Sequence, residues 1–151
     1  MVKPKVLFLC TGNSYRTQMA EAFLRDLGGD HFEVTSAGDK ITALDADAVE
    51  AMRELGIDIS SQTPKSVDHF LKQRFSFVIS LCDRQKERSC PIFPGAIWRS
   101  HWDLDNPATA QSPEERRVLV RRVRDQIRRR VVEFVREHQG TRKGASKAHG
   151  N

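Results

Sequence analysis

The stretch Cys10-Thr11-Gly12-Asn13-Ser14-Tyr15-Arg16-Thr17 decides the fold, because it joins two runs of different periodicity. Residues 6–9 before it are all apolar, which predicts a buried strand. After it, apolar residues recur at helical spacing until Gly28 and Gly29, which end the predicted helix. The core-facing side of this helix is formed by Met19, Ala20, Phe23, Leu24 and Leu27. Cys10 therefore leaves the end of a strand, and Arg16 and Thr17 open a helix.

This strand–loop–helix arrangement is suited to holding a tetrahedral oxyanion above a nucleophile. The N–H groups of a first helical turn and of a tight glycine-containing loop can converge on one anion. The planar guanidinium of Arg16 can hold two oxygens of the same anion. The positive field favours the thiolate of Cys10, which the hydroxyl of Thr17 can stabilise further. The candidate anion-binding residues are Thr11, Gly12, Asn13, Ser14, Tyr15 and Arg16.

The alternative interpretation of this stretch is a buried structural cysteine beside a solvated arginine. A cysteine and an arginine at this spacing are common by chance. The strand before them, the helix after them and the Gly-Asn-Ser between them favour the functional interpretation.

The composition indicates one compact domain. The chain has 151 residues, of which 38% are hydrophobic, and this suits a single sizeable core. No apolar run is long enough to span a membrane, and residues 1–4 do not open a signal peptide, so we expect a cytoplasmic protein. Three cysteines in such a protein predict reactive thiols rather than a disulfide framework. No dinucleotide or nucleotide-binding motif is present, so we expect no dedicated cofactor. We also expect no resident metal and a monomer.

Further strands and helices alternate along the chain. Residues 32–36 and 75–80 predict strands, and residues 45–55 predict a helix that Gly56 ends. A brief helix follows Pro64. The apolar positions of these two helices are Ala48, Ala51, Met52, Leu55, Val67, Phe70 and Leu71.

The alternation implies an α/β fold. We expect a single domain with an open parallel sheet of about four strands flanked by helices, and with the phosphate-binding loop after the first strand. In such sheets, ligands bind at the carboxyl ends of the strands, where Cys10 and Cys82 both emerge.

The other two cysteines, Cys82 and Cys90, lie eight residues apart in a strongly charged segment. Because residues 83–89 have no apolar anchor, we expect that they can flex or unwind. One alternative is a metal site that these cysteines form with His101 and Cys10, although the spacing lacks the close ligand pairs of structural zinc sites. Unrelated surface thiols are the other alternative.

A long helix is predicted from Pro113 to His138. Arginines crowd its outer sides, but acidic residues interleave with them and the net charge is only +5, which favours a solvated face over nucleic-acid binding. Residues 139–151 have no apolar side chain larger than alanine, so we expect a domain over residues 1–138 and a disordered basic tail over 139–151. The predicted core stripe of the helix is Val120, Val123, Ile127, Val131, Phe134 and Val135.

Residues 10–16 match the Cys-x5-Arg loop of the low-molecular-weight protein tyrosine phosphatase superfamily. The continuation Thr17-Gln18-Met19-Ala20-Glu21 resembles the thioredoxin-linked arsenate reductase branch, because phosphatases usually carry proline in place of the glutamine. Ser36-Ala37-Gly38 and Asp58-Ile59-Ser60 also lie where that branch has them. The resemblance extends over residues 5–138.

The resemblance implies a function for all three cysteines. The branch has a cysteine after this strand and another seven or eight residues later, followed by proline, and Cys82 and Cys90-Pro91 match that pattern. It implies an arsenate reductase for arsenic detoxification, in which Cys10 forms an adduct with arsenate and Cys10, Cys82 and Cys90 form a disulfide relay. Thioredoxin, or a similar dithiol protein, is the implied reductant, and phosphate or sulfate would compete with arsenate.

The segment His101-Trp102-Asp103-Leu104-Asp105-Asn106-Pro107-Ala108 resembles the family's general-acid segment, with one difference. The residue before Pro107 is Asn106, and an amide cannot donate a proton as an acid. Asp105, one residue earlier, is the nearest substitute and our candidate for the acid. The alternative is an ordinary acidic turn with Trp102 in the core.

Some members of the family bind a potassium ion beside the loop, through residues that match Asn13, Glu21 and Ser36 and through an acidic fourth ligand. This sequence has Lys65 near the fourth position. We predict that its ammonium takes the place of the cation and holds Glu21 and the loop in register. The alternative is an ordinary surface lysine.

Two other functions compete with arsenate reduction: a phosphatase that uses Cys10 and Arg16 alone, and a non-catalytic oxyanion-binding protein. Cys82 and Cys90 favour the reductase, because hydrolysis of a phosphocysteine needs only water and a proton donor. The missing aspartate before Pro107 favours it too, because a phosphatase depends on that acid to expel its leaving group. The complete Cys-x5-Arg loop argues against a non-catalytic protein.

Overall fold

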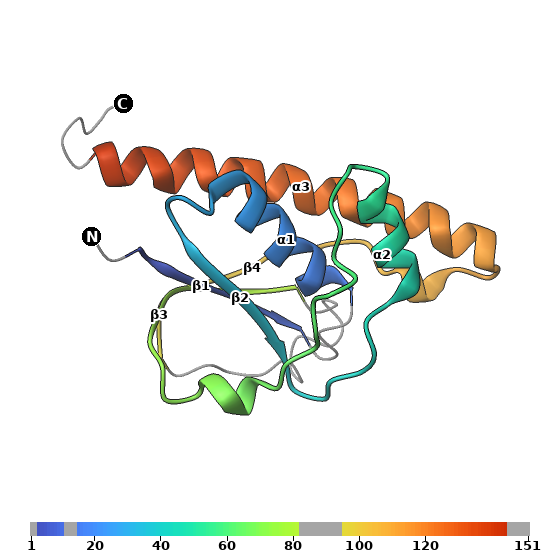
Figure 1. Ribbon diagram of the computed structural model, residues 1–151, viewed down its shortest axis with the longest axis horizontal. Coiled ribbons are helices and arrows are strands. Elements are labelled where there is room, and N and C mark those ends of the chain that lie inside the picture. Colours follow the sequence, from blue (N-terminus) through green and yellow to red (C-terminus); the bar gives the residue numbers. More distant parts are fainter. Residues whose placement is uncertain (1–2, 11–14, 82–94, 145–151) are drawn as a thin grey trace.

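Four parallel strands form the sheet at the centre of the computed structural model, which describes residues 3–10, 15–81 and 95–144 (Figure 1). The sheet has the order β2-β1-β3-β4, and each neighbouring pair is parallel. This confirms the predicted α/β class with an open parallel sheet. The strands are β1 (Lys5–Cys10), β2 (Glu33–Gly38), β3 (Phe75–Ser80) and β4 (Ala96–His101).

The register of the sheet aligns the carboxyl ends of the strands, where we expect the site. Cys10 lies opposite Gly38 of β2. Leu9 lies opposite Ser80 of β3, and Ser80 lies opposite His101 of β4. Because parallel strands end at the same edge of a sheet, Cys10 emerges beside the ends of its neighbours.

Three helices cover one face of the sheet: α1 (Arg16–Gly28), α2 (Ala46–Arg53) and the long α3 (Pro113–Gly144), which crosses behind α1 in Figure 1. Alternate side chains of β1 and β3 meet the apolar stripes of these helices, which confirms the stripes predicted from the periodicity. This core includes Val6, Phe8, Met19, Phe23, Leu24, Met52, Ile79, Val123, Ile127 and Val131.

The opposite face of the sheet has a smaller core under the short 3-10 helix η1 (Val67–Phe70). Leu7 and Leu9 of β1 enter this second core, whereas Val6 and Phe8 enter the first. Because β1 is buried on both faces, its sequence is an uninterrupted apolar run rather than an alternating one.

The sequence did not locate β4. Its large apolar residues, Ile97 and Trp98, are 67% and 65% exposed, because β4 is the outer strand of the sheet. An exposed edge strand lacks the alternation of buried and exposed positions on which the predictions of strands relied.

The helix ends differ from the predictions at three apolar positions and at the C-terminus. Leu27 was predicted to face the core, and Leu55 and Leu71 to be apolar positions within their helices, but each is 37–43% exposed at or beyond the end of its helix. We predicted the last helix to end at His138, but α3 continues to Gly144 because residues 139–144 contain no proline. The predicted tail therefore begins within α3, and its residues 145–151 lie outside the described residues.

Arg124 corrects the prediction that the arginines of the last helix form a solvated face. It is only 8% exposed. Its guanidinium donates to the carbonyl of Ala51 at 2.8 Å and to the carboxylates of Glu54 and Asp125 at 2.8 and 2.9 Å. The buried charge is tolerated because two carboxylates pair with it and a carbonyl accepts a further hydrogen bond. The contacts with Ala51 and Glu54 tie α3 to the α2 region.

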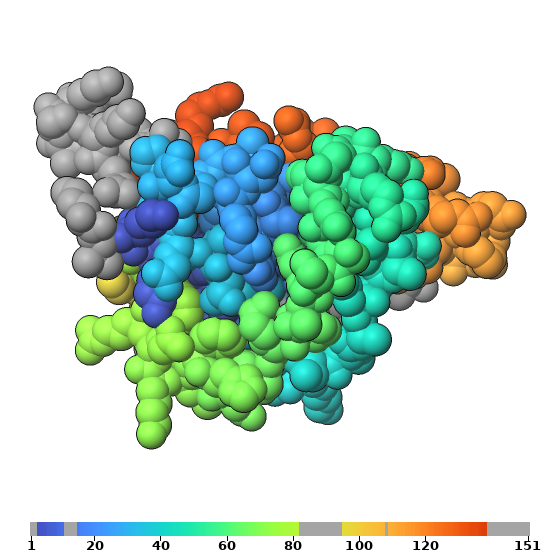
Figure 2. All heavy atoms as spheres, in the orientation of Figure 1, coloured from blue at the N-terminus to red at the C-terminus, as the bar shows by residue number. Residues whose placement is uncertain are grey.

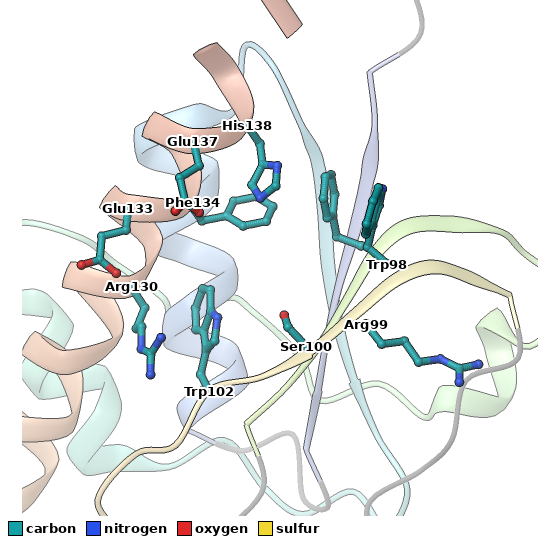
Figure 3. A pocket seen from close by; sticks show the side chains of 10 residues that line it. Trp98, Arg99, Ser100, Trp102, Arg130, Glu133, Phe134, Glu137 and His138 are labelled. Carbon is teal, nitrogen blue, oxygen red and sulfur yellow. The ribbon is translucent and has the colours of Figure 1, made fainter. Parts of the chain in front are cut away.

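A pocket of about 310 Å³ opens between β4 and the C-terminal half of α3 (Figure 3). Its wall includes Trp98, Trp102 and three rings that contact one another at tilted or edge-on angles, in which His138 lies 4.6 Å from Phe77 and 4.5 Å from Phe134 between ring centres. Of the predicted catalytic and anion-binding residues that the structure describes, none lines this pocket.

We expect the protein to lose stability as the pH falls through the ordinary titration range of histidine, partly because of His138. Burial lowers the pKa of His138, and the nearby Glu137 opposes this shift. The unfolded chain therefore takes up the proton at a higher pH than the folded chain, so stability declines as the pH falls below about 6.5. His138→Phe keeps an aromatic ring at this position but removes the titrating imidazole. It should reduce the drop in melting temperature between pH 8 and pH 5.5 by about 1–3 °C. An identical drop in both proteins would contradict this role.

Candidate functional site

Cys10 and Arg16 lie together at the carboxyl edge of the sheet. Both are 7% exposed, and Nη2 of Arg16 points a donor at Sγ of Cys10 over 4.0 Å. Cys10 is a free thiol, and it ends β1 while Arg16 begins α1, as the sequence predicted. The first strand and the first helix thus bring the nucleophile and the cation into contact from positions six residues apart.

The guanidinium of Arg16 has unused donors. Its Nε and Nη1 are buried and have no hydrogen-bond partner among the described residues. The start of α1 likewise has no side-chain cap on its N–H groups and no acidic residue in its first turn. Buried donors of this kind are costly unless a ligand satisfies them, so this edge of the sheet is built for an anion.

Several predicted site residues cannot be placed from the structure. Residues 11–14, Cys82 and Cys90 lie outside the described residues, so their predicted roles stay predictions. Thr17 is described: it is fully buried in the first turn of α1, next to Arg16, and its predicted contact with the thiolate stays a prediction.

Gln18, which the resemblance used only as a marker of the branch, ties α1 to the segment after α2. Its side-chain amide donates to the carbonyl of Thr63 at 3.2 Å, and its Oε1 accepts from Gln62 at 2.7 Å. Gln62 also donates to the backbone carbonyl of Gln18 at 3.1 Å. The two segments lie directly against each other on the surface in Figure 2. Proline at position 18 would remove this connection beside the anion site.

Lys65 reaches Glu21, as predicted. Its Nζ lies 3.4 Å from Oε1 of Glu21, and Ser36 donates its hydroxyl to the same oxygen at 2.6 Å. Arg25 pairs with the other oxygen at 2.5 Å. Glu21 is 4% exposed, so this buried carboxylate is neutralised by two side-chain cations. Lys65 is therefore paired with a buried carboxylate rather than free on the surface; its replacement of a potassium ion and its contact with Asn13 stay predictions.

We therefore expect the activity not to depend on potassium. Exchanging potassium for a larger organic cation at constant ionic strength should leave the rate unchanged, because the ammonium of Lys65 already lies on Glu21. Lys65→Met removes that charge and should lower the rate about three- to tenfold. Marked activation of the unmodified protein by potassium would contradict the role of Lys65.

The structure places Asp105 against α3. Gln126 accepts from the backbone N–H of Asp105 at 3.1 Å and donates to its carboxylate at 3.2 Å, and Arg122 lies 4.0 Å from the same oxygen. No contact joins Asp105 to Cys10 or Arg16 among the described residues. Its role as the general acid stays a prediction. Trp102 is 6% exposed, in the core, as the alternative interpretation of this segment has it.

A second polar pair at this edge was missed by the sequence analysis. The hydroxyl of Ser80 lies 2.6 Å from Nδ1 of His101, and Nε2 of His101 is buried without a partner among the described residues. The signal was available only through the register, because the two residues become neighbours when β4 pairs with β3.

The comparisons with known proteins agree with this geometry. Residues 5–144 match the family described as low molecular weight phosphotyrosine protein phosphatase. The chain belongs to this family. The arsenate reductase of Bacillus subtilis (strain 168) is 43% identical over 130 residues, which cover 85% of this chain and 93% of that protein.

Among solved structures, an arsenate reductase in the phosphate-binding state is similar, with a TM-score of 0.73 and 34% identity over 90% of this chain and 98% of that one. The thioredoxin-dependent arsenate reductase of Corynebacterium glutamicum has a TM-score of 0.71 and 26% identity, over 92% of this chain and 63% of that one.

Membrane-spanning helices and metal-binding clusters are both absent from the part of the chain that the structure describes. None of its described helices is both long and apolar enough to cross a membrane. Nor do residues 3–10, 15–81 and 95–144 contain a cluster of three or more histidine, cysteine or acidic side chains that could hold a metal ion.

Proposed function

We propose that this protein is an arsenate reductase that acts through Cys10. The observation that supports this most directly is the buried guanidinium of Arg16, which approaches Cys10 with one nitrogen and has two further nitrogens without partners. Such a group is complementary to a tetrahedral oxyanion bound above the thiol. The names of the relatives identify arsenate as the substrate of those proteins.

The first step is a substitution at arsenic. The thiolate of Cys10 attacks arsenate held by Arg16 and by the N–H groups that begin α1. A sulfur–arsenic bond forms and one arsenic–oxygen bond breaks, and the oxygen leaves as water after it takes up protons. Asp105 is the predicted proton donor. No electron is transferred in this step, and arsenic remains in the +5 state.

The second step reduces the arsenic. The thiolate of Cys82 attacks the sulfur of Cys10, and the electron pair of the sulfur–arsenic bond passes to arsenic, which leaves as arsenite in the +3 state. The two cysteines are oxidised to a Cys10–Cys82 disulfide. Cys90 then attacks Cys82, which frees the Cys10 thiolate and leaves a Cys82–Cys90 disulfide. The chain's own thiols thus supply both electrons.

An external dithiol must reduce the Cys82–Cys90 disulfide after each turnover. We propose thioredoxin, because a similar solved reductase is described as thioredoxin-dependent and because a protein dithiol can take over the disulfide by exchange. The cytoplasm is the compartment in which thiols are kept reduced for such a cycle. Phosphate and sulfate should compete with arsenate, because they present the same tetrahedral oxygens.

The test is an assay of arsenate-dependent NADPH oxidation with thioredoxin and thioredoxin reductase, run beside an assay of aryl phosphate hydrolysis. Arsenate reduction with little ester hydrolysis is the expected result. The family includes phosphatases, so ester hydrolysis without arsenate reduction would overturn the proposal in favour of a phosphatase.

A further inference from the structure

We propose that Arg116, in the first turn of α3, is a positioning residue for the anion site: it holds the ring of Tyr15 and through it the start of α1. The inference rests on the proposed function and adds a residue to its machinery. Arg116 lies one hundred positions beyond Arg16 in the sequence, and no motif in the sequence pointed to it.

The ring of Tyr15 lies within reach of two guanidinium groups. The central carbon of Arg16 is 5.0 Å from the centre of the ring, and that of Arg116 is 5.8 Å from it. Both distances are within the range of a cation–π contact. Arg16 is the residue that faces Cys10, so the ring of Tyr15 couples the arginine of the site to an arginine of α3.

Tyr15 also has a fixed backbone at the entry to α1. It is the residue before the helix, and its carbonyl accepts from the N–H of Met19 at 2.9 Å. Its ring is half-buried against the main core. Burial raises the pKa of Tyr15, although Arg16 and Arg116 oppose the shift, so the phenol is neutral at physiological pH. A displacement of this ring would carry the first residues of α1 with it.

Arg116 is itself held firmly. Its Nη1 donates to Asp45 at 3.1 Å and to Asp47 at 2.6 Å, and its Nη2 donates to the second oxygen of Asp45. Asp45 is also the N-cap of α2, where it accepts from the N–H of Asp47 at 2.8 Å. These hydrogen bonds raise the pKa of Arg116, with Asp45 as the largest favourable cause. The guanidinium of Arg116 is therefore held in one orientation.

The carboxylates of Asp45 and Asp47 balance the charge of Arg116. Arg116 is therefore not a second substrate-binding arginine that competes with Arg16 for the anion. Its remaining interaction on the site side is the face of Tyr15. Arg116 therefore holds Tyr15 in position and takes no direct part in the reaction.

Arg121 provides a matched control on the same helix. It also joins α3 to the α2 region, through two hydrogen bonds to Glu54 at 3.0 and 3.1 Å, but no ring contact joins it to Tyr15. If Arg116 only fastened α3 to α2, Arg116→Ala and Arg121→Ala would have similar effects on every property of the site.

The experiment measures the affinity for inorganic phosphate, as the concentration that protects Cys10 from alkylation by iodoacetamide, read at Cys10 by peptide mapping. Arg116→Ala should weaken phosphate binding about fivefold or more, whereas Arg121→Ala should leave it within about twofold. Tyr15→Ala should weaken it to a similar extent as Arg116→Ala. The double variant, with Tyr15→Ala and Arg116→Ala together, should bind phosphate as well as the single variant that binds it less tightly, because both substitutions remove the same contact.

Three outcomes would overturn the inference. The first is equal phosphate affinity in Arg116→Ala and Arg121→Ala, and the second is additive losses in the double variant. The third is full phosphate affinity in Tyr15→Ala, because the ring that Arg116 holds would then have no effect on the site. Melting temperatures identify any variant that has lost its fold. The assay does not require turnover, so a failure of the proposed reductase activity would be seen separately, as phosphate binding without arsenate reduction.

Discussion

Replacing Cys10 with serine is expected to abolish arsenate reduction, with a loss of at least about a thousandfold. The serine hydroxyl is a far weaker nucleophile than a thiolate at neutral pH, and it cannot form the disulfide that accounts for the two electrons. Cys10 is 7% exposed beside Arg16, whose unpaired donors would hold the anion, so the serine would occupy the same site without supplying a thiolate. The rate of thioredoxin-coupled NADPH oxidation with arsenate measures the effect.

Phosphate binding is the control for Cys10→Ser. The substitution leaves the guanidinium of Arg16 and the start of α1 in place, so the variant should keep its melting temperature and still bind phosphate, measured by calorimetry. Substantial remaining reduction of arsenate by Cys10→Ser would show that the first covalent step is wrongly assigned.

The sequence was most informative where burial imposes a period on the chain. β1 and β3 are nearly continuous apolar runs because both faces of the sheet are covered, and the stripe of α3 follows the helical repeat. These elements can be predicted without knowing which elements lie beside them. The site residues Cys10 and Arg16 could be paired for the same reason, since the strand and the helix that place them are adjacent in sequence.

What the sequence could not supply are contacts that depend on register or on distant partners. β4 is exposed along its outer edge, so neither Ile97 nor Trp98 carries a burial signal. The pairing of Ser80 with His101 exists only because β4 lies beside β3. Arg124 looks like any other arginine of the helix until α2 supplies the carbonyl of Ala51. Resemblance to the family, rather than periodicity, pointed to Lys65.

Replacing Cys90 with serine is expected to limit the enzyme to one turnover. Cys82 can still attack the Cys10 sulfur, so about one arsenite should be released per enzyme molecule, and the protein should then stall with Cys10 linked to Cys82. In the proposed relay, Cys90 transfers the disulfide away from buried Cys10, and bridging Cys82 to Cys90 requires their Cα atoms to come within about 7 Å. Residues 82–94 lie outside the described residues, so the prediction from their charged sequence, that residues 83–89 can rearrange to allow this, stays a prediction.

Cys82→Ser is the matched variant for the order of the steps. It should stall earlier than Cys90→Ser, without releasing arsenite, because the sulfur–arsenic bond of the Cys10 adduct then has no attacking thiol. Quantifying arsenite after a single addition of arsenate, together with peptide mapping of the disulfides, separates the two variants. In the proposed relay, the transfer to Cys90 moves the disulfide away from Cys10 to where thioredoxin can reduce it. Sustained thioredoxin-driven turnover by Cys90→Ser would show that this transfer is unnecessary and that the relay ends at Cys82.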